Sequence, residues 1–189
     1  MLRLPLKVAA IMRNFKPSWS VAGGWAIDLY LEKVTRPHND IEIAIFRKDQ
    51  LALYNYLKDW RLQKVVHREL MNWYQDEFLE LPIHEIHCFN EASDPQQLEV
   101  LLNETDGNEW IYRRHEKVRR PMAKCHLVSK EGVKFLCPEV VLLYKSKNPN
   151  AEDEQDFAET IKHFDAERRE WLRDAIAVCN AGHHWLNRL

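Results

Sequence analysis

The order of apolar and polar residues predicts a chain that begins as helix, short strand, tight turn and short helix. Apolar residues recur at helical spacing over residues 6–15, and a short apolar run over residues 19–22 predicts a strand that stops at Gly23 and Gly24. Residues 25–32 return to helical spacing. This helix is expected to end before Pro37, because the residue before a proline is disfavoured in the helical conformation.

The next stretch, residues 40–46, alternates strictly and predicts a half-buried strand. Ile41, Ile43 and Ile45 share one face of this strand. Asp40 and Glu42 share the other face with Ala44. Two carboxylates therefore project from the same side of one strand.

The middle of the chain predicts one helix and a series of strands. An amphipathic helix is expected at residues 48–60. Strands are expected at residues 62–66, 70–74, 81–89, 110–114 and 123–128. Asp94 followed by Pro95 is a helix-start signal, so we expect a helical segment from there to about residue 102. Residues 130–132 predict a hairpin turn inside residues 128–136.

The chain changes character after Pro138 and becomes helical. Three helices are expected, at residues 139–146, 151–164 and 166–181, with Asn150 as the cap of the second. The combined pattern predicts an α/β (α+β) fold, in which a mixed sheet is flanked by helices. We expect a core at residues 1–137 and a C-terminal helical subdomain at residues 138–189.

Composition narrows the function classes. The chain has 27 Lys+Arg and 29 Asp+Glu, and a formal net charge of -2, so it has no global electrostatic reason to bind nucleic acid or an anionic membrane. The four cysteines form no CxxC pair, which argues against a zinc ribbon or a redox motif. Reduced thiols, no visible targeting signal and no long apolar stretch together favour a cytoplasmic location.

The segment from residue 21 to residue 46 has the parts needed for phosphate chemistry. Gly23 and Gly24 let backbone N–H groups approach an anion at a helix N-terminus. Carboxylates such as Asp40 and Glu42 hold Mg²⁺ through oxygen ligands while the metal bridges phosphates. Arg36 and His38 stand just before this strand and add donors near the same place.

In this order and spacing, the segment resembles the nucleotidyltransferase superfamily. The strings GGWAID (residues 23–28) and TRPHNDIE (residues 35–42) resemble the branch that contains aminoglycoside and lincosamide nucleotidyltransferases. Three further strings are similar to the helical tail of that branch, namely LCPEVVLLYKSKNP (136–149), DEQDF (153–157) and WLRDAI (171–176).

This resemblance implies a Mg²⁺-dependent transfer of a nucleoside monophosphate, with ATP as the expected donor, to a hydroxyl of a small acceptor. An aminoglycoside or a lincosamide is the implied acceptor, and a homodimer is left open. The metal ligands would be Asp40, Glu42 and Glu85. The nucleotide would contact the residues Gly23, Gly24, Arg36, His38 and Lys145.

Glu85, in PIHEIHCF (residues 82–89), is the implied third carboxylate, either as the general base for the acceptor hydroxyl or as a metal ligand. The branch commonly shows Asp at the positions of Glu42 and Glu85. The additional methylene in each shifts an oxygen by about a bond length in a site where geometry matters to roughly half an ångström. The expected activity therefore depends on how the fold accommodates the longer side chains.

Other interpretations stay open at this point. A nucleotidyltransferase-like antitoxin, controlled by a partner, is the alternative function. His84 and His87 lie on opposite faces of a strand and do not chelate one ion. Asp28 is expected to bridge Arg36 or His38, Lys145 is either a triphosphate ligand or part of a charged helix face, and the basic run at residues 113–120 is expected to be a solvated or phosphate-facing edge.

Overall fold

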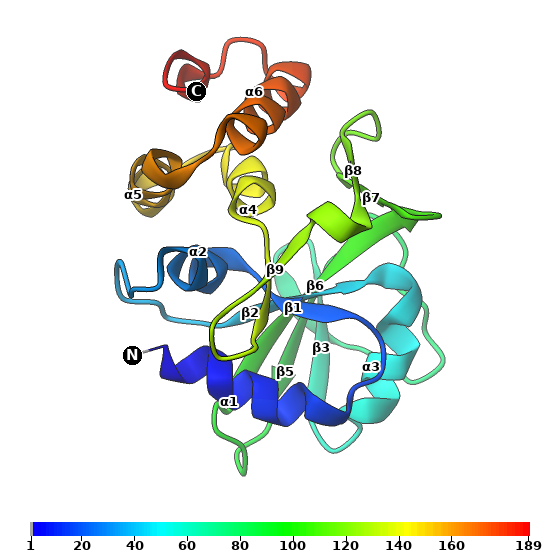
Figure 1. The fold of residues 1–189 in the computed structure, drawn as a ribbon. Helices are drawn as coiled ribbons and strands as arrows, with labels where there is room; N and C mark the ends of the chain where they lie inside the picture. The colour runs from blue at the N-terminus through cyan, green and yellow to red at the C-terminus, as the bar shows by residue number, and fades with distance from the viewer. Residues whose placement is uncertain (1) are drawn as a thin grey trace.

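The computed structural model describes residues 2–189 and has a mixed sheet with helices on both faces (Figure 1). The helices are α1 (Arg3–Ile11), α2 (Gly23–Leu31), α3 (Gln50–Tyr56), α4 (Pro138–Lys145), α5 (Ala151–Thr160) and α6 (Ala166–Cys179). The strands are β1 (Trp19–Val21), β2 (Glu42–Phe46), β3 (Arg61–Val66), β4 (Glu69–Asn72), β5 (Glu85–Phe89), β6 (Gln97–Asp106), β7 (Glu109–Ile111), β8 (Arg119–Pro121), β9 (His126–Val128) and β10 (Lys134–Leu136).

The strand order places the sequence-adjacent motifs at the centre of the sheet. The main path runs β4-β3-β5-β6-β2-β1-β10-β9, while β7 pairs with β6 and β8. The pairs β2–β6 and β1–β10 are parallel, and the remaining neighbours are antiparallel. The predicted α/β (α+β) class with a mixed sheet is therefore confirmed.

The alternation of β2 is the reason that the sheet has two covered faces. Ile43 and Ile45 belong to an apolar cluster with Leu53 of α3 and with Val8 of α1. Ala44 and Phe46 belong to the cluster on the other face, together with buried side chains of α2, α4, α5 and α6. Figure 1 shows the C-terminal helices gathered on one side of the sheet and α1 on the other.

The prediction of a helix from Asp94 to about residue 102 is wrong. This segment forms most of β6, which pairs with β2 and β5. Leu98, Val100 and Leu102 are all buried, whereas Glu99 and Leu101 are half-buried on the other face. This alternation has a period of two, and burial between two strands outweighs the local cap signal.

Other boundaries also differ from the sequence prediction. The strand expected at residues 40–46 begins at Glu42, so Asp40 lies just outside it, and the strand expected at residues 110–114 ends at Ile111. The helix expected at residues 48–60 is the shorter α3, which follows a 3-10 turn at Arg47–Asp49. The strand expected at residues 81–89 begins only at Glu85, because Arg47 binds the carbonyl oxygens of Leu79 and Ile83 at 2.7 Å each and holds that backbone as a loop. The strand expected at residues 123–128 begins only at His126, after a 3-10 turn.

Two local predictions are confirmed. Strands β9 and β10 form an antiparallel hairpin, and Gly132 in its turn has φ of +83°. Asn150 caps α5 in a capping box, since its side chain accepts from the Asp153 amide and Asp153 accepts from the Asn150 amide. The helix therefore begins where the sequence predicted it to begin.

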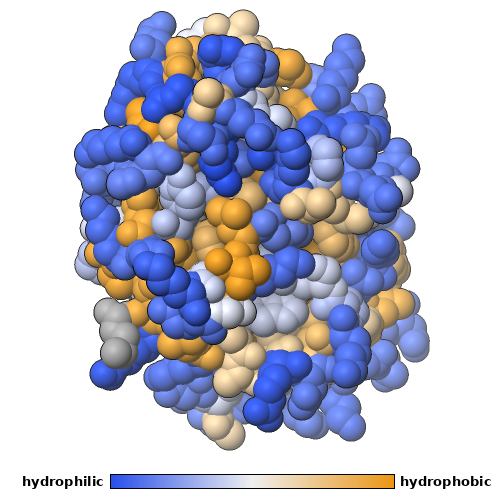
Figure 2. Space-filling view, in the orientation of Figure 1, coloured by the Kyte–Doolittle hydropathy of each residue, from blue (hydrophilic) through white to orange (hydrophobic). Residues whose placement is uncertain are grey.

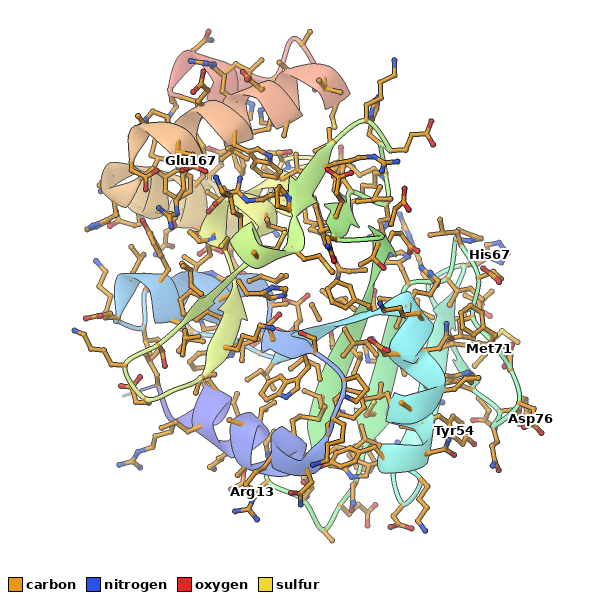
Figure 3. The ribbon with its side chains drawn as sticks, turned by 45° about the vertical axis from the view of Figure 1, so that its right-hand side comes forward. Arg13, Tyr54, His67, Met71, Asp76 and Glu167 are labelled. Atoms are coloured by element: carbon orange, nitrogen blue, oxygen red, sulfur yellow. The ribbon has the colours of Figure 1, made fainter. Side chains whose placement is uncertain are left out.

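The surface is largely hydrophilic, with apolar side chains scattered over the face shown in Figure 2. At the sheet edge, Leu70 and Met71 of β4 are half exposed, and Figure 3 shows Met71 and His67 projecting there. No helix within residues 2–189 is both long and apolar enough to cross a bilayer.

Candidate active site

The start of α2 packs directly against the carboxylate of Glu42. Gly23 has φ of +57°, and a Cβ atom placed on it would lie 1.4 Å from Oε2 of Glu42. Gly24 also leaves little room, since a Cβ there would lie 2.6 Å from Cε1 of His38 and 2.7 Å from a terminal nitrogen of Arg36. The glycine pair thus allows Glu42, His38 and Arg36 to converge on one helix N-terminus.

Glu42 is the most perturbed carboxyl group of the site. Burial is the first cause that raises its pKa to about 7, and the negative charges of Asp40, Glu99 and Glu85 raise it further. Lys145 acts in the opposite direction and lowers the pKa. The group therefore experiences an excess of negative charge that the protein itself does not neutralise.

Glu85 lies in a cluster that the sequence did not predict in full. Nε2 of His87 lies 2.7 Å from Oε1 of Glu85, and its Nδ1 lies 3.7 Å from a carboxylate oxygen of Glu99. Glu99 is the register partner of Glu42 across β2–β6 and of His87 across β5–β6. A ligand atom from each of Glu85, His87 and Glu99 lies within 4.8 Å of the others, which is close enough to hold a metal ion.

Glu99 is the acidic residue that the sequence analysis missed. The strand beside β2 is β6, and β5 with Glu85 lies one strand further away. Because residues 94–102 were predicted to be helical, Glu99 had no place on the sheet. The alternation of Leu98, Val100 and Leu102 is the signal that would have located it.

A cavity of about 250 Å³ lies above this part of the sheet. It is lined by backbone and side chains from both predicted halves of the chain, namely Ala22, Gly23, Glu42, His84, Glu85, Leu101, Leu102, Asn103, Arg113, Arg114, Leu136, Val141, Tyr144 and Lys145. Asp40 is not in that lining, and its side chain is exposed just before β2. The structure therefore places Glu42, Glu85 and Lys145 in one cavity and Asp40 beside it.

The predicted phosphate-binding cations Arg36 and Lys145 are held by α5. Arg36 forms two hydrogen bonds of 3.1 Å to the two carboxylate oxygens of Asp156, whose side chain is fully buried. Lys145 lies 2.6 Å from a carboxylate oxygen of Asp153 and 3.0 Å from one of Asp156. Both cations thus already have carboxylate partners within the protein.

His38 is held in the same manner from α2. Its Nε2 lies 2.6 Å from Oδ2 of the buried Asp28, and its ring packs on Trp25 with centroids 4.5 Å apart. Asp28 also accepts hydrogen bonds from the amide and hydroxyl of Thr35. The predicted structural role of Asp28 as a bridge to His38 is confirmed, while Arg36 turns to α5 instead.

The donor set around the cavity fits a hard divalent cation. Carboxylate oxygens from Asp40, Glu42, Glu85 and Glu99 repel one another in the metal-free protein, and a divalent cation is the ligand that relieves this repulsion. The described cysteines lie elsewhere, three of them buried, so thiolate ligands do not contribute. The chemistry of these donors favours a hard divalent cation over a soft metal.

The fold is similar to solved structures of antibiotic-modifying nucleotidyltransferases. The solution structure of the antibiotic-resistance factor ANT(2'')-Ia is 16% identical, with a TM-score of 0.62, and the match covers 95% of this chain and 92% of that chain. The lincomycin-bound crystal structure of the lincosamide antibiotic adenylyltransferase LnuA is 16% identical, with a TM-score of 0.58 and coverage of 85% and 96%. No curated protein matches the chain by sequence.

A family profile extends the agreement from fold to sequence. The profile described as aminoglycoside-2''-adenylyltransferase matches residues 5–159, which include the glycine turn, all four carboxylates of the site and α5 up to Glu159. These segments are also the ones whose geometry converges on the cavity. The chain belongs to the aminoglycoside-2''-adenylyltransferase family of nucleotidyltransferases.

Proposed function

We propose that the protein transfers AMP from Mg²⁺-bound ATP to a hydroxyl group of a small molecule. The observation that carries this proposal is the convergence of a glycine turn at a helix N-terminus with a group of carboxylates that repel one another around the buried Glu42. Phosphoryl transfer requires positioning and charge neutralisation more than covalent help from the protein. The proposed donor set is suited to both requirements.

In this proposal, Asp40 and Glu42 would hold Mg²⁺, and the metal would supply charge neutralisation for phosphoryl transfer. The acceptor oxygen forms a bond to the α-phosphorus, and the bond from that phosphorus to the bridging oxygen of pyrophosphate breaks. Glu85 accepts the proton of the hydroxyl group. His87 is hydrogen-bonded to Oε1 of Glu85, so Oε2 is the atom proposed to accept this proton.

Aminoglycosides and lincosamides are the first acceptors to test. The family profile is named for an aminoglycoside adenylyltransferase, and one similar structure contains adenylyl-2''-tobramycin (14% identity, TM-score 0.51, covering 95% of this chain and 90% of that chain). Another similar structure contains lincomycin. These antibiotics are ligands of those proteins. For this chain, the two antibiotic classes are proposed acceptors.

The test is pyrophosphate release from each of the four NTPs in the presence of Mg²⁺ and a panel of both antibiotic classes. We expect release with ATP and at least one acceptor, and its loss in Asp40→Asn. Because Asp40 is exposed, this variant should retain its melting temperature. Transfer by Asp40→Asn at the native rate would contradict the proposed metal site, and no release with any pair would contradict the proposed acceptors.

A further inference from the structure

Two arginines, Arg113 and Arg114, line the active-site cavity without a carboxylate partner. They follow β7 and stand in the lining together with Glu85 and Tyr144. Within residues 2–189, neither arginine forms an ion pair. Arg113 makes no hydrogen bond in that range, and its guanidinium lies 5.4 Å from the ring centroid of Tyr144.

Arg114 is positioned by aromatic and backbone groups alone. One of its terminal nitrogens donates to the Tyr144 carbonyl at 2.7 Å and to the Tyr112 hydroxyl at 3.2 Å. Tyr144 is itself fixed, because its hydroxyl hydrogen-bonds Oδ1 of the buried Asn103 at 3.2 Å. The other N–H groups of Arg114 remain available to a ligand, and so do all of those of Arg113.

The contrast with the other cations near the cavity is the main argument. Arg36 and Lys145 each bind Asp156, so their charges are balanced within the protein, and His38 is held by Asp28. A partly buried cation without an anion is costly, and proteins pair such groups unless a ligand supplies the charge. Arg113 is half-buried and bears this cost, while its neighbour Arg114 is exposed. The charge of both arginines is therefore left for a substrate to balance.

The electrostatic surroundings of Arg113 agree with this interpretation. Burial is the first cause that lowers the pKa of Arg113, and the positive charges of Arg114 and Arg47 act in the same direction. A second cavity, of about 410 Å³, shares Arg114 and adds His115 and Lys147 to its lining, with no carboxylate side chain among its lining residues. Nδ1 of His115 is buried without a hydrogen-bond partner in the described chain.

We propose that Arg113 and Arg114 form a subsite for an oxyanion, a phosphate or carboxylate group, carried by a substrate of the transfer reaction. Guanidinium groups bind such anions through paired N–H donors, and the aromatic support of Tyr144 keeps the two groups in place. This inference rests on the proposed function, because it assigns the subsite to one of the two substrates of that reaction. The anion is either a terminal phosphate of the nucleotide or an acidic group of the acceptor.

The probe is inorganic phosphate, titrated by calorimetry in the presence of Mg²⁺. We expect saturable binding to the wild-type protein and a loss of roughly tenfold or more in Arg113→Gln, which is the usual value of a charge-assisted hydrogen bond. Arg113→Gln should retain its melting temperature, because Arg113 makes no hydrogen bond or ion pair within residues 2–189. Arg114→Gln is the second variant and should lower the affinity for phosphate as well.

Arg13→Gln is the matched control. Arg13 is exposed and lies on the far side of the molecule from the C-terminal helices, as Figure 3 shows. This control should bind phosphate as the wild-type protein does. Absence of saturable phosphate binding, or equal affinity in Arg113→Gln and wild type, would overturn the proposal.

A second arm repeats the titration with the protein saturated by Mg²⁺ and α,β-methylene-ATP, which cannot transfer AMP. If the analogue displaces phosphate, the terminal phosphates of the nucleotide occupy the subsite. In that case, Arg113→Gln should weaken the binding of ATP more than the binding of AMP. If phosphate still binds and still depends on Arg113, the acceptor supplies the anion. In that case, the acceptor search turns to hydroxyl compounds that carry phosphate or carboxylate.

The two proposals fail separately. A wild-type protein that binds phosphate through Arg113 but releases no pyrophosphate from any NTP would retain the subsite and contradict the proposed function. A protein that transfers AMP with unchanged Michaelis constants for ATP and acceptor in Arg113→Gln would retain the function and contradict the subsite.

Discussion

At the scale of single residues, Gly23 determines whether Glu42 can occupy its place. The positive φ of Gly23 already disfavours any other residue. The additional fact is the 1.4 Å that would separate a Cβ from Oε2 of Glu42. Any side chain at position 23 must push the Glu42 carboxylate away from the helix N-terminus, so the glycine serves the geometry of the site as well as the turn.

Gly23→Ala should therefore lower AMP transfer by roughly 100-fold or more, since displacement of a positioned group by about 1 Å has effects of this size. The left-handed backbone adds a stability cost of about 1–2 kcal/mol. Gly107→Ala is the control, because Gly107 has nearly the same φ of +54° and nothing within 4 Å of its Cβ position. Activity is measured by pyrophosphate release. Equal losses in the two variants would contradict the role proposed for the close approach of Gly23 to the Glu42 carboxylate.

The sequence predicted the residues that are fixed by local geometry and missed those fixed by strand order. Gly23, Glu42 and His38 lie within one strand-turn-helix-strand unit, so their spacing carried the information. Glu99 comes beside Glu42 through the strand order β5-β6-β2, and Arg113 reaches the cavity from the segment after β7. Local alternation can place Glu99 on a strand, but it does not encode the order of the strands. Their side chains are ordinary charged residues until the sheet brings them beside Glu42 and Glu85.

At the scale of elements, α5 connects the C-terminal helices to the loop that carries Arg36. Asp156 of α5 is fully buried and receives both Arg36 and Lys145, which come from the loop before β2 and from α4. A buried carboxylate with two cations is a structural arrangement that the sequence did not predict, because the three residues are separated along the chain. It changes the expected result of removing Arg36.

Arg36→Ala should reduce the free energy of unfolding by roughly 2–4 kcal/mol, because it leaves the buried Asp156 with Lys145 alone. Lys33→Ala is the control, since Lys33 and Glu159 form an exposed pair at 3.8 Å and its loss should cost less than about 1 kcal/mol. Urea denaturation measures both values. The double variant Arg36→Ala with Asp156→Asn should recover part of the loss, and failure to recover any would assign the effect to a different contact.

At the scale of the whole molecule, the two predicted parts of the chain share one apolar cluster. Val21, Ala44 and Phe135 from the sheet lie in the same cluster as Phe157 and Leu172 from the C-terminal helices. The division at residue 137 stays a prediction about the chain, and this shared core favours unfolding of both parts together. A charge buried between them therefore changes the stability of the entire fold.

Glu42 is that charge, and it makes the stability of the metal-free protein depend on pH. Its pKa of about 7 in the folded state lies above the ordinary value of 4.5, so the folded protein binds this proton more tightly than the unfolded chain does. The favourable contribution is complete below pH 4.5 and is lost as the pH rises through about 7. The free energy of unfolding should fall over this interval.

Glu42→Gln removes this dependence. We expect the variant to be more stable than the metal-free wild type at pH 8 by roughly 1–3 kcal/mol, and to differ little from it at pH 4.5. Glu131→Gln, in the exposed turn between β9 and β10, is the control and should show no such change. Chemical denaturation at both pH values measures the difference. Addition of Mg²⁺ at pH 8 should raise the free energy of unfolding of the wild type and leave that of Glu42→Gln nearly unchanged. If Mg²⁺ stabilises Glu42→Gln as much as the wild type or more, Glu42 is not a ligand of the proposed metal site.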